Sequence, residues 1–265
     1  MSLAPHVPPA DTAGFDAWVA DLETRHLRDL TPAEVARALR ALSSTYVERR
    51  ARLSGRGAYD SAGKRAAYAL YYAPRRFLTI RAVLARLDAP TGPRAILDLG
   101  CGTGAAGAAW AVHAGPGATV RGVDVHPWAL DEARATWRAF GVPGDVRRGG
   151  VVETRRPAPS RRGTAPQGVM ASCVANELDD ADRAALLDDL LGRAAAGAQV
   201  LVMEPLSRRT SPWWPAWTRA IVAAGGRHDE WRLPLDPPPI TRALGRAAGL
   251  DPIEASGRTL WLARG

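Results

Sequence analysis

Residues 95–104 read AILDLGCGTG and decide the fold of this chain. A run of apolar residues around Asp98 passes directly into three glycines, Gly100, Gly102 and Gly104. Glycine lets the chain turn sharply and lets a ligand approach the backbone, and a helix that starts there offers unpaired amide groups. Because ligands of open α/β sheets bind beyond the carboxyl ends of the strands, this segment predicts a strand, a ligand-binding turn and a helix.

Apolar bursts and amphipathic stretches alternate from this segment onward. The bursts predict buried strands at 95–99, 119–125, 146–148, 168–174 and 199–205. A 3.6-residue apolar period predicts helices near 105–113, 128–140 and 180–195. Near the C-terminus we expect a helix at 240–248 and then a closing pair of strands, DPIEAS (251–256) and RTLWLAR (258–264). This alternation predicts an α/β fold with a mostly parallel sheet.

Residues 1–12 are rich in proline and alanine and predict a loose lead-in, and residues 15–87 have a helical pattern. We therefore expect a helical N-terminal region of residues 1–90 before a domain of residues 91–265. The sequence Thr31-Pro32-Ala33-Glu34 fits a helix start, because the threonine hydroxyl and the glutamate carboxylate can cap free amides. Within the second domain, residues 153–168 contain too many prolines and glycines for a helix. We expect a basic loop there.

Composition excludes several classes of protein. The chain has 265 residues, 46% of them hydrophobic and 23% charged, which is enough for a sizeable core. No run approaches the roughly 20 apolar residues of a membrane span, and no secretory leader is evident, so we expect a cytoplasmic protein that does not enter a membrane. Two cysteines, Cys101 and Cys173, cannot form a multi-cysteine metal site, so we expect no metal.

The formal charge of +8 is unevenly distributed. Residues 1–90 carry 14 basic and 9 acidic side chains, and residues 146–168 carry 6 basic and 1 acidic, whereas residues 169–203 carry 2 basic and 6 acidic. Of the 35 basic residues, 34 are arginines and the remaining one is Lys64. A nucleic-acid surface and a solvated arginine-rich surface both fit this pattern.

Two acidic residues end neighbouring predicted strands. Asp98 precedes the glycine turn, where its carboxylate would attract a cationic group and repel a pyrophosphate. Asp124 ends the next strand, where it can accept hydrogen bonds from both hydroxyls of a ribose. Gly102, Gly104 and Gly107 also fit the GxGxxG spacing of NAD-binding proteins, so a dinucleotide is a second reading that spacing alone leaves open.

The D-x-G-x-G-x-G arrangement, with Asp124 at the next strand end, resembles class I S-adenosylmethionine-dependent methyltransferases. The resemblance implies a Rossmann-like, mostly parallel seven-stranded sheet with S-adenosylmethionine as cofactor and S-adenosylhomocysteine as product. It also implies a cofactor-binding set around the glycine turn and the second strand end: Asp98, Gly100, Cys101, Gly102, Gly104, Asp124, Val125 and His126. A local hydrogen-bonding role is the alternative for His126.

A narrower resemblance runs over most of residues 31–206. The segments LRALSSTYVERR (39–50), AAYALYYAPRRF (66–77), ASCVANELDDADRAALLDDLL (171–191) and VLVMEP (200–205) are similar to a methyltransferase-like family associated with the small ribosomal subunit, which includes mitochondrial ribosome assembly factors. Members of that family carry a cysteine cluster implicated in iron-sulfur binding. No cysteine follows residue 206 here, so this chain departs from the family pattern.

Candidate acceptor-side residues follow the fourth and fifth predicted strands. Asn176 and Glu177 are the candidate catalytic residues, with Glu177 placed to orient an amine or accept its proton. The alternative is that Asn176 caps the helix that begins near Asp179 and that Glu177 is structural. Glu204 is a candidate substrate-binding residue at the fifth strand end.

Aromatic residues are further candidates for substrate binding. Trp213 and Trp214 are expected near the carboxyl edge of the sheet, where they could stack on a base, a peptide or a small aromatic molecule. Tyr68 and Tyr72 could cover the cofactor. For both groups, packing of the fold is the alternative.

The sequence therefore predicts methyl transfer to a nitrogen or oxygen acceptor. Ribosomal RNA or a small-subunit particle is one candidate acceptor. A small molecule or peptide is the second. A cofactor-binding ribosome assembly factor without turnover is a third reading.

Overall fold

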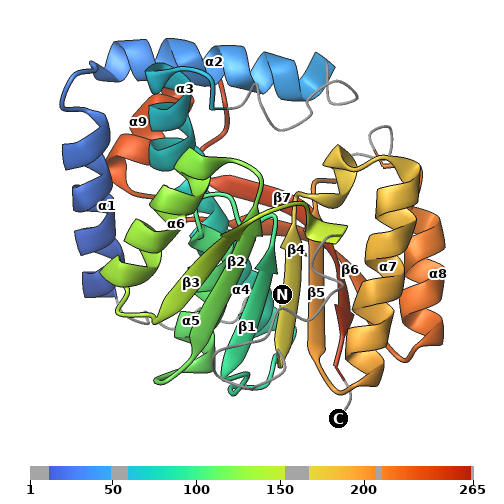
Figure 1. Cartoon of the computed structure of the whole chain (residues 1–265). Coiled ribbons are helices and arrows are strands. Elements are labelled where there is room, and N and C mark those ends of the chain that lie inside the picture. The colour runs from blue at the N-terminus through green and yellow to red at the C-terminus, as the bar shows by residue number, and fades with distance from the viewer. Residues whose placement is uncertain (1–11, 49–58, 153–166, 207–210, 264–265) are drawn as a thin grey trace, which may run out of the picture.

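The structure is a computed structural model that describes residues 12–48, 59–152, 167–206 and 211–263. Its centre is a seven-stranded sheet in the order β3-β2-β1-β4-β5-β7-β6 (Figure 1). The strands are β1 (Ala95–Leu99), β2 (Thr119–Asp124), β3 (Gly144–Arg148), β4 (Gly168–Ser172), β5 (Gln199–Glu204), β6 (Arg227–Pro234) and β7 (Glu254–Leu262). The strands from β3 to β5 are parallel, and β7 is antiparallel to both neighbours. The predicted mostly parallel seven-stranded sheet is confirmed.

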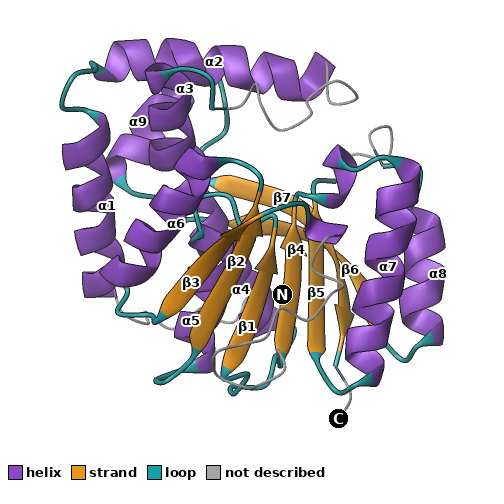
Figure 2. Ribbon diagram, in the orientation of Figure 1, coloured by secondary structure: helices purple, strands orange, loops and turns teal. Residues whose placement is uncertain are grey.

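Helices cover both faces of the sheet (Figure 2). One face packs against α4 (Ala73–Arg86), α5 (Ala105–Ala114) and α6 (Pro127–Ala139), and the other against α7 (Asp180–Ala195) and α8 (Trp214–Ala223). Alternate residues of β1 serve the two cores: Ile96 belongs to the first, and Leu97 to the second. No described helix is long and apolar enough to cross a membrane.

The expected pair of C-terminal strands is wrong. Residues 251–256 and 258–264 contribute to one strand, β7, and its antiparallel partner is β6, RHDEWRLP. Sequence patterning missed β6 because it is an edge strand, exposed along much of its length, and lacks a clean apolar alternation. The Trp-rich segment, for which no helix was expected, forms α8. The predicted helix near 240–248 is confirmed as α9 (Pro239–Ala248).

The N-terminal helices are α1 (Thr12–His26), α2 (Pro32–Glu48) and α3 (Ala62–Ala67), followed by the π-helix η2 (Tyr68–Tyr72), which continues into α4. The predicted start of α2 is confirmed. The Thr31 amide donates to Glu34 Oε2 at 2.8 Å, and the Glu34 amide donates back to Thr31 Oγ1 at 3.3 Å. The first buried core runs without a break from α1 through α4 and α5 to the sheet.

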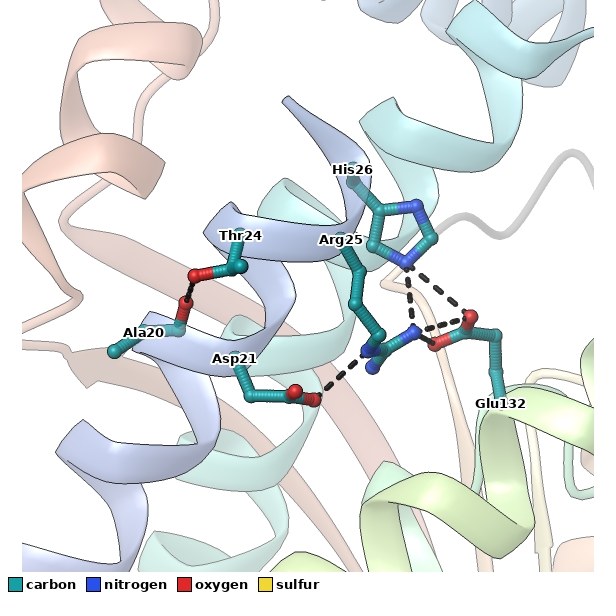
Figure 3. A network of polar contacts seen from close by, with 6 residues as sticks. All are labelled: Ala20, Asp21, Thr24, Arg25, His26 and Glu132. Atoms are coloured by element: carbon teal, nitrogen blue, oxygen red, sulfur yellow. Dashed lines mark hydrogen bonds and ion pairs between the residues drawn. The ribbon is translucent and has the colours of Figure 1, made fainter. Parts of the chain in front are cut away.

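Helix α1 is attached to α6 by a polar network that Figure 3 shows from close by. Arg25 donates from Nη1 to both carboxylate oxygens of Glu132, at 2.6 and 2.9 Å, while its Nε donates to Asp21. On the same helix α1, Trp18 is fully buried, with its ring centroid 5.3 Å from that of Phe140. These contacts hold the N-terminal helices beside the carboxyl edge of the sheet (Figure 1).

The π-helix lies over that edge. A π-turn widens a helix by one residue and is frequent at functional sites. Three contacts connect η2 and α4 to the C-terminal segment. Thr241 donates to Leu70 O at 2.7 Å, Tyr71 donates to Asp251 O at 3.2 Å, and Arg75 donates to Glu254 O at 2.7 Å. The N- and C-terminal parts of the chain thereby form one roof over the carboxyl ends of the strands.

Candidate functional site

A cavity of about 380 Å³ lies under this roof. It runs from the glycine turn after β1, across the ends of β4 and β5, to the first residues of β7. Strand order reverses between β1 and β4, which is the topological position where α/β sheets bind ligands. Seven of the predicted site residues line it: Tyr68, Tyr72, Asp98, Gly100, Cys101, Gly102 and Glu177.

The glycine turn has the conformation that its sequence predicts. Gly100, Gly102 and Gly104 have φ angles of +66°, +51° and +76°, in the left-handed region that favours glycine. A Cβ at Gly100 would also lie 2.3 Å from Val174 Cγ2. Gly104 then precedes the first turn of α5. The turn thus brings backbone amides to the cavity without side chains between them and a ligand.

Asp98 is a buried carboxylate at the floor of the cavity. It is 1% exposed; Oδ2 accepts from the Gly107 amide at 2.9 Å, and Oδ1 has no hydrogen-bond partner among the described residues. Burial raises its pKa to about 7, and the charge of Asp124 adds to this. A Cβ at Gly107 would lie 2.8 Å from Asp98 Oδ2, so the third glycine of the NAD-like spacing is needed for Asp98. An unpartnered carboxylate oxygen here fits a cation and opposes a pyrophosphate.

Cys101 also lines the cavity, and burial raises the pKa of its thiol well above the ordinary value. Its sulfur occupies the space above Gly122, where a Cβ would lie 2.7 Å away from it. Cys101 therefore shapes the turn as a neutral thiol.

Asp124 ends β2 and holds the turn from the other side. Its Oδ2 accepts from the Gly102 amide and its Oδ1 from the His126 amide, each at 2.9 Å. Val125 is exposed, and its carbonyl accepts from Arg148 Nε at 3.3 Å. These residues lie beyond the lining of the cavity, on its β2 side.

An aromatic cluster covers that side. The Tyr59 ring lies 4.8 Å from both Tyr68 and His126 and 4.9 Å from Trp128, measured between centroids. Burial lowers the pKa of His126, and the neighbouring Arg65 adds to this, so the ring is a neutral stacking partner at pH 7. Tyr59 was missed from the sequence because it lies in a stretch that reads only as a break between helices.

Asn176 belongs to a network that fixes the ends of β4 and β5. Its Nδ2 donates to Glu204 Oε2 at 2.7 Å, and its Oδ1 accepts from Ser211 Oγ at 2.7 Å and from Trp213 Nε1 at 3.0 Å. Glu204, 1% exposed, also accepts from the Ala175 amide. The described lining of the cavity does not include Asn176, Glu204, Trp213 or Trp214.

The alternative role for Asn176 as a helix cap is wrong. Asp179 caps α7 by accepting from the Asp182 amide at 2.8 Å, and Asn176 lies in the separate short turn η4 (Ala175–Glu177). Glu177, the neighbour of Asn176, is exposed and lies at the cavity.

The two tryptophans have different surroundings. Trp214 is buried under Arg258, whose guanidinium carbon lies 4.3 Å from the ring centroid, and it belongs to the core between α8 and the sheet. Trp213 donates to Asn176 Oδ1, and its ring centroid lies 5.6 Å from the guanidinium carbon of Arg183.

Arg76 and Cys173 line the cavity and were not predicted as site residues. Arg76 donates from Nη2 to Cys173 Sγ at 2.8 Å. Cys173 has a φ of +59°, a strained conformation for a residue other than glycine. No sequence pattern marks this pair, because one residue lies on a helix and the other follows a buried strand.

Comparison with solved structures shows the same fold. A putative O-methyltransferase from Nostoc punctiforme matches at 16% identity and a TM-score of 0.50, covering 88% of this chain and 70% of that one. The plantazolicin methyltransferase BpumL, solved with a monoazolic desmethylPZN analogue and S-adenosylhomocysteine, matches at 12% identity and a TM-score of 0.50, covering 88% of this chain and 98% of that one. No curated protein sequence matches the chain.

Residues 96–192 match the family model described as a methyltransferase domain. The chain thus contains a methyltransferase domain, and its cofactor is S-adenosylmethionine. The matched residues begin in β1 and end in α7, so they include the glycine turn, Asp98 and Glu177. The prediction of an enzyme with this cofactor is confirmed, and the narrower likeness to the small-subunit family stays a prediction.

The cavity of this methyltransferase fits the methionine end of the cofactor. Gly100 and Gly102 leave the backbone open, and the unpartnered Asp98 oxygen suits an ammonium group. Asp124, with the aromatic cluster beside it, is placed for the nucleoside end. When bound, S-adenosylmethionine supplies an electrophilic methyl group on a sulfonium. Among the described residues, no group of three His, Cys, Asp or Glu side chains could hold a metal ion.

Proposed function

We propose that this methyltransferase transfers its methyl group to a nitrogen atom of a small-molecule or peptide acceptor. The observation that carries the proposal is the position of Glu177, an exposed carboxylate on η4 that lines the cavity at the end of β4. A carboxylate in that position can orient an amine and accept its proton.

Tyrosine rings define the space next to Glu177. Tyr68 and Tyr72 lie on the wide π-turn, with ring centroids 5.4 Å apart. Burial raises the pKa of Tyr68, and Glu177 is one of the negative groups that add to this, so the ring is neutral. Neutral aromatic walls favour the approach of an apolar or cationic group and exclude water from the transfer.

The residues of this chain contribute to methyl transfer mainly by positioning the acceptor. Direct displacement needs the acceptor nucleophile in line with the methyl group, and holding two reactants in that geometry supplies much of the rate. The network of Asn176, Glu204 and Ser211 fixes the turn that presents Glu177. We infer that Asn176 acts through this turn as a positioning residue.

Glu177→Gln tests the role of the carboxylate. The variant should lower kcat by about 10²- to 10⁴-fold while its affinity for S-adenosylhomocysteine stays within about twofold of wild type. Asp131→Asn, which removes an exposed carboxylate on α6, is the matched control and should retain wild-type kcat. Unchanged turnover in Glu177→Gln would refute the proposed proton acceptor.

The acceptor itself is tested with a radiolabelled methyl group. The enzyme is offered amines and short peptides in one pool and small-subunit ribosomal RNA in another. Label should enter the first pool. The plantazolicin methyltransferase, which has a similar fold, was solved in complex with a monoazolic desmethylPZN analogue and not with RNA.

Ribosomal RNA is the second candidate, because residues 1–90 are basic and several motifs resemble the small-subunit family. The arginine-rich segment 153–166 lies outside the described residues. Label that enters RNA, with affinity that falls steeply as salt rises, would refute the small-molecule proposal in favour of this candidate.

A further inference from the structure

Two oppositely charged groups line the same cavity on elements that face each other. Asp98 lies near the carboxyl end of β1, and Arg76 lies on α4. The charge of Arg76 acts on Asp98 and opposes the effect of burial on its pKa. The cavity is therefore a dipolar site, with a carboxylate on one wall and a guanidinium on another.

Arg75 and Arg76 are the two cations in the described lining, and their surroundings differ. Arg75 donates to the carbonyls of Pro252 and Glu254 and lies 5.1 Å from the Tyr71 ring centroid. Through these contacts Arg75 connects η2 and α4 to the C-terminal segment.

Arg76 has a weaker hydrogen-bond acceptor than the two carbonyls that Arg75 contacts. It donates to Cys173 Sγ at 2.8 Å, and sulfur is a weak hydrogen-bond acceptor. Within the part of the chain that the structure describes, no carboxylate forms an ion pair with Arg76. Burial disfavours its charge, but Cys173, Tyr68 and Glu204 outweigh this and raise its pKa, so Arg76 is a cation at every pH of interest.

The cofactor matches this pair of charges. The methionine portion of S-adenosylmethionine ends in an ammonium and a carboxylate on the same carbon atom. Asp98 Oδ1 lacks a partner and suits the ammonium, while a planar guanidinium is the side chain best suited to a carboxylate. We propose that Arg76 binds the carboxylate of the methionine portion, with Cys173 as the residue that positions its guanidinium.

The strained backbone at Cys173 supports this arrangement. A residue other than glycine at φ near +60° is strained, and such strain persists where the surrounding structure enforces it. The Cys173 amide donates to Met203 O at 2.8 Å, which holds the strained residue at the end of β5. In this conformation the sulfur lies within hydrogen-bond distance of Arg76.

Two ligands that differ only at the amino-acid end test the proposal. S-adenosylhomocysteine carries the carboxylate, and 5′-methylthioadenosine is the corresponding nucleoside thioether without the amino acid. In calorimetric titrations, Arg76→Gln should weaken binding of S-adenosylhomocysteine by about 10- to 100-fold, as expected for a charge-assisted hydrogen bond. Binding of 5′-methylthioadenosine should stay within about twofold of wild type, which also shows that the variant is folded.

Two further variants make the result specific. Arg76→Lys keeps the charge without the planar donors, and it should recover part of the lost affinity. Arg86→Gln removes the same charge from the other end of α4, where Arg86 donates to Ala82 O, and it should leave both affinities unchanged.

Three outcomes would overturn the proposal. Equal weakening of both ligands would make Arg76 a structural residue, and unchanged affinity for both would place the carboxylate elsewhere, such as at the first turn of α5. Absence of binding to S-adenosylhomocysteine in the wild type would overturn the proposal together with the cofactor assignment. Because the test uses no acceptor, a wrong acceptor in the proposed function would leave its result unaffected.

Discussion

Asp98→Asn should make the protein more stable and the cofactor bind less tightly. Asp98 is 1% exposed, and burial raises its pKa from 3.8 to about 7. A shift of about 3 pKa units, at 1.36 kcal/mol for each unit, corresponds to about 4 kcal/mol of destabilisation when the carboxylate is ionised. Asparagine keeps an acceptor for the Gly107 amide and carries no charge, so it avoids this cost.

The pH dependence has a definite sign. The folded state holds the Asp98 proton more tightly than the unfolded state does. Protonated Asp98 therefore stabilises the fold relative to its ionised form, fully below about pH 4, and this contribution is lost as pH rises to about 7. The stability of the wild type relative to Asp98→Asn should therefore fall between pH 4 and pH 7 and stay constant above pH 7. There the variant should exceed the wild type by up to about 4 kcal/mol.

Urea unfolding at intervals between pH 4 and pH 9, without ligand, measures this difference. Calorimetry at pH 8 measures the second half of the prediction, a loss of affinity for S-adenosylhomocysteine. A carboxylate that served the fold would give the opposite result, since its removal would lower stability at pH 8. Parallel stability curves for the two proteins would also refute the reasoning.

Two further predictions concern the turn and the N-terminal helices. Gly100→Ala should destabilise the protein by about 2–5 kcal/mol, because left-handed strain adds to a contact of 2.3 Å with Val174; Gly141→Ala, at a φ of +63° with open space around it, should cost only about 1–2 kcal/mol in the same urea assay. Glu132→Gln should cost about 2 kcal/mol at pH 7. Although burial opposes ionisation, hydrogen bonds from His26 and Arg25 lower the pKa of Glu132, so this cost should begin to decrease below the ordinary value of 4.5 and be lost below the lowered pKa. An equal cost at pH 3 and pH 7 would contradict the ion pair.

The local signals in the sequence were strongest where backbone geometry restricts residue type. The positive φ angles of Gly100, Gly102 and Gly104 can be inferred from glycine alone, and β1 has the predicted bounds of residues 95–99. The start of α2 could also be predicted from the sequence, since Thr31 and Glu34 form their hydrogen bonds with each other within one helical turn.

Features that depend on contacts between residues far apart in the chain could not be predicted from the sequence. The β6 strand gains its structure from eight residues paired with β7, and nothing in RHDEWRLP marks it as a strand. The Arg76–Cys173 contact joins residues 97 positions apart, and the strained φ of Cys173 leaves no trace in residue type. The π-turn that presents Tyr68 and Tyr72 was also beyond prediction, because its apolar pattern is that of an α-helix.

The central claim, that the carboxyl edge of this sheet binds S-adenosylmethionine, is tested most directly by calorimetric titration of the full chain with S-adenosylhomocysteine. We predict one site per chain and a clear loss of affinity in Asp124→Ala, because Asp124 holds the turn through the Gly102 amide and is placed for the ribose. NAD should give no binding under the same conditions. Tight binding of NAD, or no heat with S-adenosylhomocysteine, would contradict the account.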